Sequence, residues 1–196
     1  MFARTERLLL RPSWPEDAAE LHQAIADEGI VRNLARAPWP YTVDDAVQFA
    51  TQAHDPLYPA FLLMLRTHGA PRIIGACGIG NDDGSAELGY WIARPYWGLG
   101  FATEASRAVV NIAKAIGHKK LTSSHFTDNP ASGNVLRKLG FQNTGETALR
   151  HSNGRGAAMT CALYEKALDG AGTESSARLS PPAFSMRAQM ERLQAA

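Results

Sequence analysis

The sequence predicts an α/β protein with a mixed, mostly antiparallel sheet of about seven strands flanked by helices. Short runs rich in aliphatic and aromatic residues alternate along the chain with segments whose apolar residues recur at helical spacing. With 196 residues, 45% of them hydrophobic, the chain is also long enough to bury one sizeable core. We therefore predict one domain over residues 1–168 and a flexible tail over residues 169–196 that could hold a short amphipathic helix.

The first part of the chain predicts one strand and two helices. Residues 6–11, ERLLLR, form a short apolar run that indicates a strand. The segment that follows begins with prolines and then spaces its apolar residues as a helix does. Thr42 is suited to cap a second helix over about residues 43–53, because Asp44 and Asp45 follow in its first turn.

Three further strands are predicted before residue 94. AFLLMLR at residues 60–66 and RIIGACGI at residues 72–79 are joined by the turn sequence THGAP, which indicates a β-hairpin. The polar cluster NDDGS at residues 81–85 predicts a second turn. AELGYWIA at residues 86–93 then has the aromatic and aliphatic content of a fourth strand.

The second half predicts two helices and three strands. Apolar residues repeat at helical spacing from Phe101 to Ile116, and Gly117 follows as a helix-ending glycine. Asn129 can cap another helix, which begins at Pro130 and ends at Gly140. The remaining strands are predicted at residues 121–127, 141–146 and 157–166, with the polar loop RHSNGRG between the last two.

Composition argues against several classes of protein. Neither a signal peptide nor a membrane span is indicated, so a cytoplasmic protein is expected. Cys77 and Cys161 lie in apolar, strand-like surroundings without CxxC spacing, which predicts buried thiols rather than a disulfide or a metal site. No lysine-rich run with interleaved aromatic residues is present, so nucleic acid is not an expected partner.

The charges are unevenly distributed although the net charge is only +1. Residues 1–100 contain 8 Lys or Arg against 12 Asp or Glu, whereas residues 101–196 contain 12 against 7. This asymmetry favours a cationic ligand near the first half and an anionic ligand near the second half.

The stretch YWGLGFATEA, residues 96–105, places two glycines between a predicted strand and a predicted helix. Such a turn aims several backbone N–H groups at one point, and the helix dipole favours negative charge there, so a phosphate is the expected ligand. A Walker loop, GxxxxGK followed by Ser or Thr, does not occur. A dinucleotide fingerprint would begin at Gly98, but its third glycine falls on Thr103, and the basic HKK near residue 118 replaces the expected acid.

A third phosphate-binding design fits better. WGLGFA, residues 97–102, is similar to the acyl-CoA loop of the GNAT superfamily of N-acetyltransferases, matching at Gly100 and Ala102 and departing at Trp97. TERLLLRP, ELGYWIARPYWGLGFATEA and DNPASGNVLRKLGF together resemble the ribosomal-protein-alanine N-acetyltransferase branch, over roughly residues 4–166. The resemblance implies acetyl-CoA as cosubstrate, no metal, and a splay between the fourth and fifth strands.

The resemblance also implies where acetyl-CoA binds. The pantetheine arm is expected to enter the splay along the fourth strand, and main-chain amides of the glycine turn are expected to hold the diphosphate. Asn129 either contacts CoA at the mouth of the splay or only caps its helix. The expected contacts are Tyr90, Trp91, Ile92, Trp97, Gly98, Leu99, Gly100, Phe101, Ala102, Thr103 and Asn129.

Two residues are expected to take part in the chemistry. Ser132 matches the serine that this branch is proposed to use as hydrogen-bond donor to the leaving sulfur, while Leu136 stands where many members carry a tyrosine. Glu87 lies one residue away from the position where some members of the superfamily carry a glutamate base that works through water, so the resemblance implies a base or water-holding role. The alternative is a solvated carboxylate at the strand edge. Glu104 is expected either to contact the acceptor substrate or to stabilise the start of its helix.

These observations favour an acetyl-CoA-dependent N-acetyltransferase that acts on a primary amine by direct attack. The acceptor would be a protein N-terminal amine or a small-molecule amine. The alternative is a CoA-binding sensor or scaffold without turnover, which the absent tyrosine would suit. No membrane partner is expected, and a monomer and a homodimer both stay open.

Overall fold

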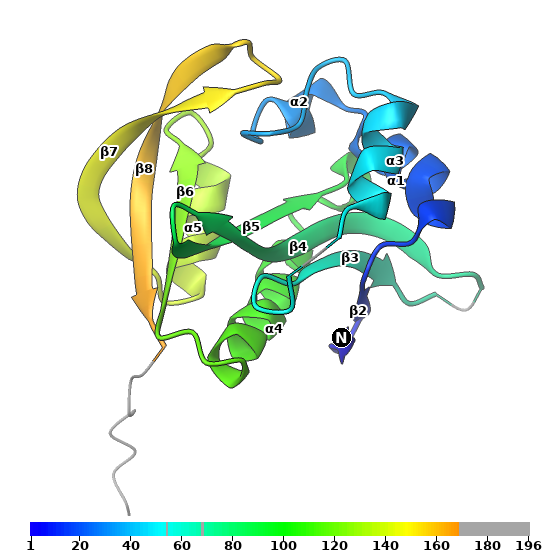
Figure 1. Ribbon diagram of the computed structural model, residues 1–196, viewed down its shortest axis with the longest axis horizontal. Coiled ribbons are helices and arrows are strands. Elements are labelled where there is room, and N and C mark those ends of the chain that lie inside the picture. Colours follow the sequence, from blue (N-terminus) through cyan, green and yellow to red (C-terminus); the bar gives the residue numbers. More distant parts are fainter. Residues whose placement is uncertain (54, 68, 169–196) are drawn as a thin grey trace, which may run out of the picture.

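The computed structural model describes residues 1–53, 55–67 and 69–168, and the predicted tail lies outside the described residues (Figure 1). A single sheet of eight strands has the order β1-β2-β3-β4-β5-β6-β8-β7. Its strands are β1 (Ala3–Arg4), β2 (Leu8–Arg11), β3 (Ala60–Leu65), β4 (Arg72–Asp82), β5 (Ser85–Ile92), β6 (Lys120–Phe126), β7 (Gln142–Ser152) and β8 (Ala157–Ala167). Neighbouring strands are antiparallel except for β5 and β6, which are parallel. The predicted mixed, mostly antiparallel sheet is confirmed, and the additional strand is the two-residue β1.

Helices cover both faces of the sheet, and Figure 1 shows α4 on the opposite side of the sheet from α1 and α3. The helices are η1 (Pro15–Asp17), α1 (Ala18–Ile25), α2 (Glu28–Val31), α3 (Val43–Thr51), η2 (Arg94–Tyr96), α4 (Phe101–Ala115) and α5 (Pro130–Lys138). On one face, Ala105 of α4 and Leu136 of α5 are buried against Leu88 of the sheet. On the other face, Leu21 of α1 packs in a second cluster with Leu62. Fully burying one such leucine stabilises the fold by about 1.5–3 kcal/mol.

The predicted helix caps are present. Thr42 and Asp45 form a reciprocal capping box, in which the Thr42 hydroxyl accepts from the Asp45 amide at 3.2 Å and the Asp45 carboxylate accepts from the Thr42 amide at 2.8 Å. The Asn129 side chain accepts from the Ser132 amide at 3.4 Å and so caps α5. Each cap satisfies a backbone donor that the first helical turn leaves without a partner.

The structure differs from the predicted boundaries at two hairpins. β7 extends to Ser152, beyond the predicted end at residue 146, because it is the outer strand of the sheet and most of its side chains are exposed. Apolar alternation is therefore weak there, and pairing with β8 defines the strand. The β4–β5 turn is reduced to Asp83 and Gly84, which both have positive φ, at 47° and 84°.

The short helix α2 is absent from the sequence prediction. It spans only Glu28–Val31, which is about one turn and too short to show helical periodicity. Asp27 caps it by accepting from the Ile30 amide. α2 lies above the end of the sheet where β5 and β6 separate (Figure 1).

Candidate active site

β5 and β6 separate after a single ladder pair, Glu87 with Thr122. The Ser123 hydroxyl still donates to the Leu88 carbonyl at 2.9 Å, and β6 then pairs on its other side with β8. The end of β5 therefore has a strand partner only on its β4 side. The predicted splay between the fourth and fifth strand-like segments, here β5 and β6, is confirmed.

The glycine turn follows β5 and begins α4. Gly98 and Gly100 have φ values of 77° and 84°, in the left-handed region that favours glycine, and Gly100 is the N-cap residue of α4. Within the described part of the chain, no carbonyl or side chain accepts a hydrogen bond from the amides of residues 98–103. These free donors lie at the positive end of the α4 dipole, which is the arrangement that binds phosphate in many proteins.

A cavity of about 350 Å³ connects the glycine turn with the splay. Most of the predicted acetyl-CoA contacts line it, together with residues of α2 and α5. Its lining comprises Ile30, Asn33, Leu34, Tyr90, Trp91, Ile92, Tyr96, Trp97, Gly98, Gly100, Phe101, Ala102, Thr103, Asn129, Ala131, Ser132, Asn134, Val135 and Lys138. A larger depression of about 590 Å³ beside the β3–β4 turn contains none of the predicted residues.

Three of the predicted site residues lie outside that lining. The Leu99 side chain is exposed, and its carbonyl accepts a hydrogen bond from Arg7 at 3.0 Å. Glu87 lies at the closed end of the splay, and Glu104 faces the N-terminal segment. The other predicted residues are brought together around one cavity.

Ser132 is held at the start of α5 by two neighbours. The Asn129 side-chain amide donates to the Ser132 hydroxyl oxygen at 3.0 Å, which leaves the hydroxyl hydrogen free to donate. The Tyr90 hydroxyl donates to the Ser132 carbonyl at 3.0 Å and so links β5 to α5. Burial raises the pKa of Tyr90 above its ordinary value, so the phenol stays protonated.

Glu87 is part of a small charged cluster. Its Oε1 accepts from Arg150 at 2.6 Å and from the Ser124 hydroxyl at 3.2 Å, while Arg150 also binds Asp82 at 2.7 Å. Oε2 of Glu87 accepts no hydrogen bond from the described residues. Burial alone would lower the pKa of the Arg150 guanidinium, but the neighbouring carboxylates of Glu87 and Asp82 outweigh burial and raise it. This guanidinium therefore stays charged.

Both carboxylate oxygens of Glu104 are engaged. Oε1 accepts from the Thr5 hydroxyl at 2.5 Å and from the Arg7 amide at 2.9 Å, and Oε2 accepts from the Arg7 guanidinium at 2.7 Å. Partial burial opposes ionisation, but these hydrogen bonds outweigh it and lower the pKa of the Glu104 carboxyl below its ordinary value. Glu104 therefore ties the start of α4 to the N-terminal segment.

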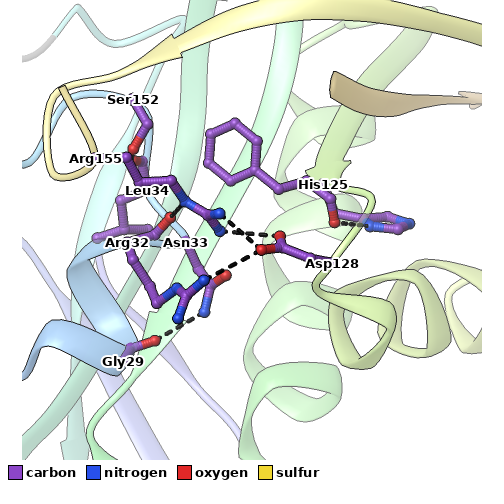
Figure 2. Close-up of polar contacts among 9 residues, drawn as sticks. Gly29, Arg32, Asn33, Leu34, His125, Asp128, Ser152 and Arg155 are labelled. Carbon is purple, nitrogen blue, oxygen red and sulfur yellow. Dashed lines mark hydrogen bonds and ion pairs between the residues drawn. The ribbon is translucent and has the colours of Figure 1, made fainter. Parts of the chain in front are cut away.

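Figure 2 shows a second ion-pair network, which the sequence patterns did not indicate and which lies just beyond the end of β6. Arg155, in the β7–β8 turn, binds Asp128 through two hydrogen bonds at 2.7 and 2.9 Å and donates to the Arg32 carbonyl at 2.6 Å. The Arg32 side chain reaches Asp128 at 3.3 Å. We call Arg32, Asp128 and Arg155 the clasp, because they join the β7–β8 turn, the segment after α2 and the β6–α5 loop.

Further contacts hold the β7–β8 turn against the segment after α2. The Ser152 hydroxyl donates to the Leu34 carbonyl at 3.0 Å, and the Asn153 amide donates to the Ala35 carbonyl at 2.9 Å. A Cβ added to Gly154 would lie 2.7 Å from Val31, so glycine permits this close approach. The clasp thus fixes α2, whose neighbours Asn33 and Leu34 line the cavity.

Neither cysteine is suited to carry an acyl group. Burial raises the pKa of the Cys77 thiol to about 12. Burial also raises the pKa of Cys161, which is 2% exposed. Among residues 1–53, 55–67 and 69–168, no group of three His, Cys, Asp or Glu side chains could hold a metal ion, and no helix is long and apolar enough to cross a membrane.

Comparison with known proteins identifies the family. The sequence model of the Acetyltransferase (GNAT) domain matches residues 7–142. An uncharacterized N-acetyltransferase, p20, from Bacillus licheniformis is 28% identical over 149 residues, which cover 72% of this chain and 82% of that protein. The chain therefore belongs to the GNAT acetyltransferase family, whose members take their acetyl group from acetyl-CoA.

Solved structures show the same fold at low sequence identity. A GNAT-family acetyltransferase from Bacillus anthracis superposes with a TM-score of 0.73 at 20% identity, and the match covers 87% of this chain and 100% of that chain. A ribosomal-protein alanine acetyltransferase from Vibrio fischeri gives a TM-score of 0.71 at 20% identity, covering 86% of this chain and 97% of that one. The predicted likeness to that branch is thus confirmed at the level of the fold.

Proposed function

We propose that this GNAT acetyltransferase transfers an acetyl group from acetyl-CoA to a primary amine by direct attack. One observation carries the proposal: a single cavity joins the unpartnered amides of the glycine turn to the gap between β5 and β6. A diphosphate suits the first part and an extended thioester arm suits the second.

The proposed binding mode follows the lining of the cavity. The amides of residues 98–103 bind the diphosphate, and the free edge of β5 at Tyr90–Ile92 offers backbone groups to the pantetheine amides. The Trp97 indole donates to the Ile92 carbonyl at 2.6 Å, so this tryptophan fixes the end of β5 against the turn. Lys138, at the rim of the cavity, adds positive charge for the phosphates.

In the proposed reaction the neutral amine nitrogen attacks the carbonyl carbon of the thioester. The C–N bond forms, the C–S bond breaks, the amine loses a proton, and CoA leaves as a thiolate that then takes a proton. Ser132 is suited to donate a hydrogen bond to the departing sulfur, because Asn129 occupies its oxygen and leaves its hydrogen free. Leu136 is fully buried and apolar, so it offers no acid at the position where many family members have a tyrosine.

Glu87 is the proposed base or water-holding group. It lies at the last ladder pair before the strands diverge, and its Oε2 is free of hydrogen bonds from the described residues, so a water could bridge it to the amine. The negative charge of Glu87 and Asp82 exceeds the single positive charge of Arg150 in this cluster. A cationic acceptor, either a peptide N-terminus or a small amine, suits that balance.

Turnover is tested by following release of free thiol from acetyl-CoA with a panel of amines and N-terminal peptides. We expect thiol release above the hydrolysis background with at least one primary amine and none with its N-acetylated form. Calorimetric titration with CoA and with NAD tests binding separately. Binding of CoA without turnover across the panel would favour the sensor or scaffold alternative, and absence of CoA binding would refute both. A cytoplasmic location and a monomeric or homodimeric state stay predictions from the sequence.

A further inference from the structure

The glycine turn is held from the side that faces away from the cavity. Arg7, just before β2, donates to the Leu99 carbonyl at 3.0 Å and binds the Glu104 carboxylate at 2.7 Å. Its guanidinium also lies 4.0 Å from the centre of the Phe101 ring. One side chain therefore contacts the turn before, at and after the start of α4, and Arg7 itself does not line the cavity.

The bond to Leu99 sets the direction of the next amide. In a planar trans peptide the C=O and the N–H point in opposite directions. Because the Leu99 carbonyl points to Arg7, the Gly100 N–H points to the other side. Gly100 lines the cavity whereas Leu99 does not, which agrees with this direction.

The bond to Glu104 affects charge at the same place. A carboxylate in the first turn of α4 interacts favourably with the helix dipole, but its negative charge also repels an anionic ligand bound at that end of the helix. Arg7 neutralises Glu104 and keeps the carboxylate turned toward Thr5 and the N-terminal segment. The Glu104 side chain is only 16% exposed, so solvent screens its charge weakly.

We propose that Arg7 is a positioning residue for the diphosphate of acetyl-CoA: it orients the Gly100 amide into the cavity and cancels the charge of Glu104 behind it. The inference rests on the proposed acetyl-CoA binding mode. It also gives a role to TERLLLRP, since Thr5 and Arg7 of that motif are the partners of Glu104.

The test compares the dissociation constants of CoA for the wild type, Arg7→Ala, Arg7→Lys and Arg4→Ala by calorimetry. Arg4→Ala is the matched control, because Arg4 is an exposed arginine three positions earlier on the same segment. Loss of one charge-assisted hydrogen bond predicts a CoA dissociation constant about tenfold higher for Arg7→Ala. Arg7→Lys keeps the charge but cannot reach Leu99 and Glu104 together, so about a threefold rise is expected. Arg4→Ala should match the wild type.

A second probe separates positioning of the diphosphate from a general role in folding. S-acetylpantetheine carries the thioester arm without the diphosphate, and its affinity should be the same for the wild type and Arg7→Ala. Equal losses for both probes, or an unchanged CoA affinity in Arg7→Ala, would overturn the proposal. If Arg7→Ala does not fold, Arg7→Lys decides, and wild-type CoA affinity in that variant refutes the role. Failure of the wild type to bind CoA would instead refute the proposed function.

Discussion

The two walls of the cavity are each held by an arginine and a carboxylate, but the two pairs act on different kinds of groups. At the glycine turn, Arg7 and Glu104 contact the turn on the side away from the cavity, and the groups that face the cavity are main-chain amides. At the opening, the clasp joins the β7–β8 turn, the segment after α2 and the β6–α5 loop, and side chains such as Asn33 face the cavity. The comparison indicates that one wall depends on backbone conformation and the other on side chains that can vary.

Gly100→Val would break the backbone-built wall and should have the largest effect. Valine is strongly disfavoured at a φ of 84°, and strain of this kind costs about 1–3 kcal/mol, so the CoA dissociation constant should rise by about 5- to 140-fold. Gly84→Val is the matched control, because Gly84 has the same φ of 84° but lies in the β4–β5 turn. Calorimetry should show weaker CoA binding only for Gly100→Val. Equal CoA binding by both variants would contradict an amide-built phosphate site.

Ser132→Ala probes the chemical step without altering either wall. A hydrogen bond to the departing sulfur is worth about 10- to 100-fold in rate, so kcat should fall by that factor while CoA affinity is unchanged. Thiol release with the true acceptor measures kcat, and calorimetry measures affinity. Asn134→Ala, a change at another lining residue of α5, is the control. An unchanged kcat would remove Ser132 from the reaction.

Arg155→Ala would break the side-chain-built wall. Arg155 is 11% exposed and makes three hydrogen bonds, so its loss should lower the free energy of unfolding by about 1–3 kcal/mol. The acceptor KM should rise several-fold while the CoA dissociation constant stays the same, because the glycine turn is not touched. Denaturant unfolding and steady-state kinetics check these two effects. Arg137→Ala, whose partners lie within α5, should leave the acceptor KM unchanged.

The smallest expected effect is a difference between Glu104 and Asp128 in how each contributes to the loss of stability at acid pH. The folded-state pKa of Glu104 lies below its ordinary value of 4.5, so its contribution to stability is present above that pH and is lost as pH falls through the folded value. The free energy of unfolding of Glu104→Gln should therefore fall less steeply than that of the wild type as the pH drops below about 4.5. Asp128→Asn should change this slope less than Glu104→Gln does, because the Asp128 side chain is 44% exposed, against 16% for Glu104. Thermal unfolding at several pH values measures both slopes.

Local sequence signals predicted most of the fold. Thr42 and Asn129 were identified as caps because capping depends on residues within one turn of the helix. Gly98 and Gly100 were identified because they stand between a predicted strand and a predicted helix, and both have the positive φ that glycine adopts readily. β7 was predicted too short and α2 was missed, because an exposed outer strand and a one-turn helix carry little apolar periodicity.

The supports of the site could not be predicted from local patterns. Arg7 and Glu104 are 97 residues apart, and Arg155 and Asp128 are 27 apart, so only the folded topology brings each pair together. For Arg7, the sequence indicated only that the residue lies in TERLLLRP, one of the segments that resemble the family. It did not indicate what Arg7 does. Glu87 and Arg150, 63 residues apart, are a further case in which the sequence identified one partner only.

The single pair of residues that joins β5 to β6 has a mechanical consequence. β1 to β5 and β6 to β8 form two half-sheets that share this one ladder pair and a few side-chain hydrogen bonds, such as those from Ser123 to Leu88 and from Arg150 to Glu87. Their relative position therefore also depends on the helices packed across them. A ligand that touches both halves would act as an additional link. Amides near the junction should then exchange hydrogen with solvent more slowly when CoA is present, and the melting temperature should increase with its concentration.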